Sequence, residues 1–178
     1  MVKCILENGL KVKVWVDDFP IESKQMKGKY LSRAQKKMWI NSKQLVVELF
    51  IPRDHNNYAL LGIEFIPDNE KQVKIKMSIE NEGSHEYNTS IAPQIDTVTW
   101  GIFEEYKHGI MNSFNKFLKN GKLPSGTIYY NISAQGEIGS SQNMFEMVSD
   151  ILLSLLTVEH ICESTVMCIV KQCMGTRE

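Results

Sequence analysis

Side chains able to do acid–base or metal chemistry are few and scattered in this sequence. The four histidines have no spacing typical of a metal-binding motif; they are His55, His85, His108 and His160. His85 lies between Glu82 and Glu86, where a metal could bind, but the polar surroundings favour a solvated loop. Glu104 and His108 are four residues apart, which favours a surface pair over a catalytic base. We therefore predict no catalytic residue, no metal site and no cofactor.

The four cysteines have no recognisable framework either; they are Cys4, Cys162, Cys168 and Cys173. Their spacing matches neither a zinc-binding pair of cysteines nor an even set of disulfides in a secreted protein. Buried thiols in a reducing compartment are favoured, and a redox sensor is the alternative. The start of the chain has no signal-peptide pattern and no run of about 18 apolar residues occurs, so we expect a cytoplasmic protein without a membrane partner.

The segment 134–141 (AQGEIGSS) combines glycines with a pair of serines before an expected helix. Its candidate site residues are Gly136, Gly139, Ser140 and Ser141. Free backbone N–H groups at a helix start attract anions. A tight strand-to-helix connection with an ordinary N-cap is favoured instead, because the segment has no lysine or arginine and Glu137 would repel a phosphate.

Charge is distributed unevenly along the chain, although the net charge of 178 residues is only −1. Residues 21–44 contain seven basic side chains and one acidic side chain, whereas residues 45–178 contain ten basic and seventeen acidic ones. Two aromatic residues lie within the basic segment. Cations interleaved with aromatic rings are typical of surfaces that bind single-stranded nucleic acid. The candidate binding residues are Lys24, Lys27, Lys29, Tyr30, Arg33, Lys36, Lys37 and Trp39.

Two structures of the basic segment compete with an RNA-binding surface. One is a solvated loop, and the other is a helix whose apolar stripe, Leu31, Ala34 and Met38, packs on the acidic remainder of the chain. If the segment packs on the chain itself or on a protein partner, we expect RNA to bind only weakly.

Strand patterns dominate the first half of the sequence. Asn8-Gly9 is a strong hairpin signal between two β-rich runs. Val73, Ile75 and Met77 alternate with polar residues, as in a half-solvated antiparallel strand. We predict strands over residues 2–7, 10–16, 45–51, 59–66, 71–79 and 127–133, with strand character at 95–100.

Helical spacing of apolar residues appears in the second half. One helix is predicted over 101–120, with Gly121 as its stop, and a second over 141–156, capped by Ser140, Ser141 or Asn143. Residues 157–174 fit a helix or a strand. The length and the 43% hydrophobic content predict a single α+β domain over 1–178, with an N-terminal hairpin and basic segment (1–44) before the sheet and helices (45–178). We expect strands 45–79 to form an antiparallel sheet with both helices on one face.

Residues 105–145 resemble the fourth domain of elongation factor G. The shared pattern is a tyrosine-led helix, a Gly-x-Leu turn, a strand, and a tight loop with paired serines before a helix that begins with phenylalanine. The matching positions are Tyr106, Gly121, Leu123, Ser140, Ser141 and Phe145, with Ile138 in place of a valine and Gly126 after a one-residue insertion. The resemblance implies a βαβ unit with a left-handed crossover on a mostly antiparallel sheet.

The chain departs from that family at Ser113, at Gly139 and at Gly136, which stands in place of the loop-tip histidine that faces the ribosome. It also lacks a phosphate-binding loop, so we expect no GTPase activity. The resemblance implies a non-catalytic, stand-alone domain that associates with RNA or the ribosome. The alternatives are a protein-binding module, such as an inhibitor or immunity-type partner, and an enzyme of unknown type. The sequence does not predict the oligomeric state.

Overall fold

The computed structural model describes residues 1–5, 9–20, 27–33, 42–53, 55, 57–77 and 85–175, with the backbone alone for 27–33. The strands within these ranges are β1 (Val2–Ile5), β2 (Lys11–Val16), β3 (Lys27–Arg33), β4 (Lys43–Phe50), β5 (Tyr58–Pro67), β6 (Gln72–Met77), β7 (Val98–Trp100) and β8 (Gly126–Gly136). The helices are α1 (Lys107–Lys119), preceded by the 3-10 turn η1 (Glu104–Tyr106), α2 (Gln142–Leu156) and α3 (Glu163–Gly175).

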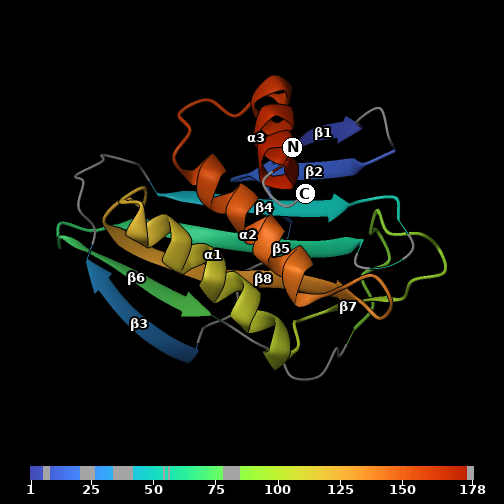
Figure 1. Cartoon of the computed structure of the whole chain (residues 1–178), viewed down its shortest axis with the longest axis horizontal. Helices are drawn as coiled ribbons and strands as arrows, with labels where there is room; N and C mark the ends of the chain where they lie inside the picture. Colours follow the sequence, from blue (N-terminus) through green and yellow to red (C-terminus); the bar gives the residue numbers. More distant parts are fainter. Residues whose placement is uncertain are drawn as a thin grey trace.

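The strands form one mixed sheet in the order β1-β2-β4-β5-β8-β6-β3, with β7 paired to the end of β8 (Figure 1). Every pairing is antiparallel except that of β6 with β8. The predicted α+β fold with a mostly antiparallel sheet is therefore confirmed. The pairing of β1 with β2 also agrees with the predicted N-terminal hairpin, and Gly9 has a φ of 74°.

The prediction that strands 45–79 pair with one another is wrong for β6. β4 and β5 are antiparallel neighbours, but β8 lies between β5 and β6. β6 runs parallel to β8, with Ile75 opposite Ile128. Alternating polarity identifies a strand and the face it buries, but it does not identify the neighbouring strand.

α1 belongs to the connection between the parallel strands β6 and β8. Adjacent parallel strands need such a crossover because a tight hairpin joins only antiparallel ones. The arrangement β6-α1-β8 is thus a βαβ unit. The left-handed course of this crossover stays a prediction from the resemblance.

One face of the sheet, called here the helix face, is covered by α1 and α2, which lie next to each other across the strands (Figure 1). This agrees with the prediction that both helices occupy one face. Phe114 of α1 and Phe145 of α2 are buried against aliphatic residues of β4, β5 and β8. α3 extends this core toward β1 with Val166, Ile169 and Val170.

The opposite face of the sheet, called here the rear face, has a separate apolar cluster. Trp15, Phe19, Tyr58 and Leu60 are buried there, and the chain segment 85–100 packs over them. The rings of Trp15 and Phe19 meet edge to face with centroids 5.0 Å apart. Trp100 packs on Tyr87 at 4.6 Å. This segment has little regular structure apart from β7.

The end of α1 and the start of α2 follow the sequence signals, but the predicted start of the first helix at residue 101 is wrong, because 101–103 are not helical, 104–106 form the 3-10 turn and α1 begins at Lys107. Ser141 is the N-cap of α2, and its hydroxyl accepts a hydrogen bond from the Met144 amide at 3.3 Å. Gly121 has a φ of 61° directly after α1, and Lys122 donates its amide to the Phe117 carbonyl, which closes the helix end. Of residues 157–174, whose type the sequence left open, 157–162 are neither helix nor strand, and the rest belong to α3.

Candidate nucleic-acid interface

The part of the basic segment that the structure describes is a strand, so the predicted helix through Leu31 is wrong for these residues. β3 occupies the end of the sheet and pairs with β6, with Tyr30 opposite Ile75 and Leu31 opposite Lys74. Four of the candidate residues, Lys27, Lys29, Tyr30 and Arg33, lie on β3. The other four, Lys24, Lys36, Lys37 and Trp39, fall outside the described residues.

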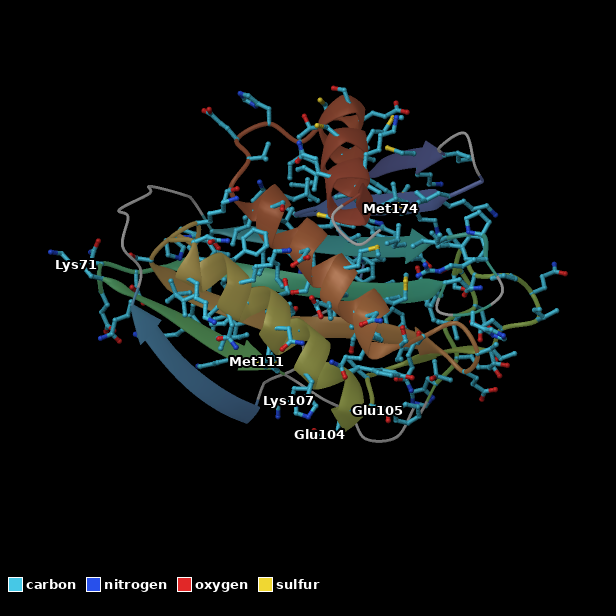
Figure 2. The ribbon with its side chains drawn as sticks, viewed as in Figure 1. Lys71, Glu104, Glu105, Lys107, Met111 and Met174 are labelled. Atoms are coloured by element: carbon cyan, nitrogen blue, oxygen red, sulfur yellow. The ribbon has the colours of Figure 1, made fainter. Side chains whose placement is uncertain are left out.

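The neighbouring strand β6 adds further lysines beside β3. Val73, Ile75 and Met77 are buried in the helix-face core. Because side chains alternate along a strand, Lys74 and Lys76 point toward the rear face. Lys71 precedes β6 and projects from the tip of the turn between β5 and β6 (Figure 2). Two lysine-containing segments more than thirty residues apart in sequence thereby form adjacent strands at one edge of the sheet.

An aromatic side chain accompanies these lysines on the rear face. Tyr129 of β8 lies opposite Lys76 across the parallel pair. The Lys76 ammonium is 3.4 Å from the Tyr129 hydroxyl and 4.8 Å from the centre of its ring. Tyr129 is only half-buried, so the residue is partly accessible to solvent.

Carboxylates balance some of this positive charge. Lys74 forms ion pairs with Asp68, at 3.4 Å, and with Glu70. The hydrogen bond to Glu70 raises the pKa of Lys74, so the lysine stays charged. Glu64 of β5 lies opposite Tyr129 of β8 and adds a further carboxylate near these lysines.

We call the edge of the sheet formed by β3, β6 and Lys71 the basic edge.

The loop candidates at the end of β8 surround a carboxylate of the chain itself. Asp96 accepts the amides of Ile138, at 2.9 Å, and Gly139, at 3.0 Å. The Gly136 amide donates to the Ser140 hydroxyl, which in turn donates to the Tyr58 carbonyl. The amide groups of this loop are therefore used within the fold, and Asp96 fills the place that an external anion would take.

The loop is built around Gly139 because space is lacking for a side chain there. A Cβ atom on Gly139 would lie 2.3 Å from Asn57 Oδ1 and 2.5 Å from Asp96 Oδ2. The Gly139 carbonyl also accepts the amides of Asn57 and Tyr58. The candidate residues Gly136, Gly139, Ser140 and Ser141 thus join β8, β5 and α2, and Ser141 caps α2.

Sequence reasoning missed a buried carboxylate on the rear face. Glu48 is fully buried and accepts hydrogen bonds from the Tyr58 hydroxyl, at 3.0 Å, and the Ile91 amide, at 2.9 Å. The Lys13 ammonium is 3.1 Å from its other oxygen and also bonds the Thr89 carbonyl. Burial and the adjacent carboxylate raise the pKa of Tyr58 well above its ordinary value. A single glutamate inside the apolar run 45–51 was the only sequence signal.

The cysteines occupy different environments around α3. Cys162 is exposed at the start of α3, and its sulfur lies 3.1 Å from the hydroxyls of Ser164 and Thr165. These hydrogen bonds lower the pKa of Cys162 to about 7. Cys4 is buried beneath α3, and burial raises the pKa of its thiol.

Comparisons with protein families, with curated proteins and with solved structures found no match. The resemblance to elongation factor G therefore stays a prediction from residues 105–145. Within the described ranges, no helix is long and apolar enough to cross a membrane. In the same ranges, no three His, Cys, Asp or Glu side chains are grouped as metal ligands.

Proposed function

We propose that this protein is a non-catalytic binding module that associates with single-stranded RNA through its basic edge. The observation that supports this most strongly is the pairing of β3 with β6. That pairing places Lys71, Lys74 and Lys76 beside the basic segment. Without them the basic segment would be isolated in an otherwise acidic chain. The expectation from elongation factor G, a factor that works on the ribosome, agrees with an RNA partner.

Phosphate contacts account for most of the affinity in this proposal. Lysine and arginine release counterions from the nucleic acid, so the logarithm of the affinity falls with the logarithm of salt by about 0.7 for each phosphate contacted on a single strand. Tyr129 contributes stacking, because base–aromatic stacking is worth about 1–3 kcal/mol per base. The Lys76 ammonium beside the ring fits a phosphate next to the stacked base.

Filter binding with a fluorescent single-stranded RNA, from low to physiological salt, tests the proposal. We expect sub-micromolar binding at low salt, a steep salt dependence, and loss of at least about tenfold in affinity in Lys71→Glu/Lys76→Glu. Lys36→Glu/Lys37→Glu is expected to weaken binding as well. The matched control is Lys3→Glu/Lys171→Glu, which changes the same amount of charge at two exposed lysines, on β1 and on α3, away from the basic edge.

Two results would contradict the RNA proposal. One is absent or salt-insensitive binding by the unchanged chain. The other is equal weakening by Lys3→Glu/Lys171→Glu and by the double variant of the basic edge, which would indicate attraction by total charge alone. Circular dichroism of each variant establishes that the fold is retained.

A further inference from the structure

Exposed hydrophobic side chains gather at one part of the surface, where β7, η1 and the loop after β8 meet. The side chains of Ile95, Phe103 and Ile138 are 82%, 44% and 54% exposed. They make up half of the large hydrophobic residues that are exposed in the described ranges; the others are Met1, Ile5 and Ile66. Exposed apolar groups scattered singly need no explanation, whereas a group of them marks an interaction site.

Contacts between the residues around β7, η1 and the loop after β8 join Ile95, Phe103 and Ile138 into one ordered surface. Asp96, next to Ile95, accepts the Ile138 amide at 2.9 Å. The Tyr106 hydroxyl donates to the Ser140 carbonyl at 3.4 Å, and the ring of Phe103 packs on Tyr106 with centroids 6.0 Å apart. These two hydrogen bonds and the ring contact hold the segments that carry Ile95, Phe103 and Ile138 together in the free protein. Binding would therefore cost little conformational entropy.

The same surface is acidic. The two stretches that build it, 85–106 and 134–148, contain no lysine or arginine. Glu104, Glu105 and Glu137 are exposed within it, and Glu104 and Glu105 lie at the start of α1 in Figure 2. Lys107 neutralises one of them through its ion pair with Glu104 at 3.1 Å. We call the surface formed by Ile95, Phe103, Ile138 and these three glutamates the acidic end.

We propose that the acidic end docks a partner protein through a segment that presents apolar side chains flanked by lysine or arginine. The apolar residues would contribute burial, and the surrounding glutamates would select a basic partner by charge complementarity. RNA does not fit this surface, because its phosphates would meet carboxylates. A second copy that presented the same acidic surface would be repelled for the same reason.

A synthetic amphipathic peptide of leucine and lysine serves as the probe, and fluorescence anisotropy measures its binding to the full chain. We expect salt-sensitive binding that falls by at least about tenfold in Ile95→Ser/Ile138→Ser. Glu105→Gln/Glu137→Gln is expected to weaken peptide binding at low salt and to make it less sensitive to salt. Ile66→Ser is the matched control, because Ile66 is also an exposed isoleucine but lies on β5, away from the acidic end. The corresponding leucine–glutamate peptide should not bind.

Several outcomes would overturn this proposal. The first is that the leucine–lysine peptide does not bind. The second is that the leucine–lysine and leucine–glutamate peptides bind equally well. The third is that Ile66→Ser weakens peptide binding as much as Ile95→Ser/Ile138→Ser does. Self-association in analytical ultracentrifugation that Ile95→Ser/Ile138→Ser abolishes would assign the surface to a second copy instead. RNA binding by the full chain that falls in Ile95→Ser/Ile138→Ser but not in Ile66→Ser would assign the surface to nucleic acid. Because the basic-edge variants are not used, failure here leaves the RNA proposal unaffected.

Discussion

The helix face and the rear face of the sheet are buried by different means. On the helix face, α1 and α2 satisfy their own backbone hydrogen bonds and contribute mainly aliphatic and phenylalanine side chains. On the rear face, the covering segment 85–100 has little regular structure apart from β7, so some of its backbone groups need side-chain partners from the sheet. Glu48 accepts the Ile91 amide, and Lys13 donates to the Thr89 carbonyl. The buried carboxylate of the rear face thus bonds the backbone of an irregular segment, whereas the buried Asp150 of α2 pairs with a side chain of the neighbouring helix, Lys116 of α1.

The largest effect of any single change is expected on the helix face. Phe114→Ala and Phe145→Ala each remove a buried ring and leave a cavity, which costs about 3–5 kcal/mol of unfolding free energy. Urea unfolding followed by circular dichroism measures it. Phe103→Ala is the control, because that ring is 44% exposed and its loss should cost less than about 1 kcal/mol. Similar losses for Phe103 and Phe145 would show that the helix face is not the main core.

A smaller loss is expected from the rear face when its buried carboxylate is removed. Glu48→Ala leaves the Tyr58 hydroxyl and the Ile91 amide without their acceptor, at a cost of about 2–3 kcal/mol. Tryptophan fluorescence should also change in Glu48→Ala, because Trp15 lies beneath the covering segment and Trp100 is part of it. Glu64→Ala, on the open part of the same face, should stay within about 0.5 kcal/mol of the unchanged protein. Equal effects of the two substitutions would remove the contrast between the faces.

The cap of α2 is expected to contribute about 1 kcal/mol to the helix face. Ser141→Ala removes the hydroxyl that accepts the Met144 amide, and N-cap serines are worth about that amount. Gln142→Ala, at the next position, is the control and should leave the midpoint of thermal unfolding almost unchanged. No difference between the two variants would mean that water replaces the serine at this helix end.

The thiols around α3 should differ in reactivity while stability hardly changes. The pKa of about 7 at Cys162 means that its thiolate fraction, and hence its alkylation rate, rises as pH increases through 7 and levels off above it. Ser164→Ala/Thr165→Val removes the hydroxyl donors and should shift this profile to higher pH. Cys4 should stay unmodified in the folded protein, because it is buried and its pKa is raised. Iodoacetamide labelling with peptide mass spectrometry checks both, and fast labelling of Cys4 would show that α3 detaches.

Local patterns predicted the parts of the fold that depend on near neighbours. The spacing of Phe114 and Phe117 identified the buried side of α1, and Gly121 and Ser141 identified the helix ends. These signals act within a few residues, so one sequence contains them in full. The alternating polarity around Ile75 likewise identified β6.

Features that depend on distant partners were not predicted. Nothing local to 71–79 indicates that β8 lies beside it, and nothing in 27–33 distinguishes an edge strand from a helix stripe. The role of Asp96 depends on amides about forty residues later. For the candidate site, the sequence identified the basic segment, but only the strand order places Lys76 of β6 beside β3, with Tyr129 of β8 on the other side of β6.

The central position of β8 also affects the order in which the chain can fold during its synthesis. Strands β1, β2, β4 and β5 can pair with one another once residue 67 has emerged from the ribosome. β6 and β3 can pair only with each other until β8 is made, because β8 bonds both β5 and β6. A nascent chain that ends before Gly126 therefore exposes an unpaired edge of β5, which other chains could pair with. Completion of the sheet late in translation makes prompt release or chaperone protection more important for this protein than for one whose strands pair in sequence order.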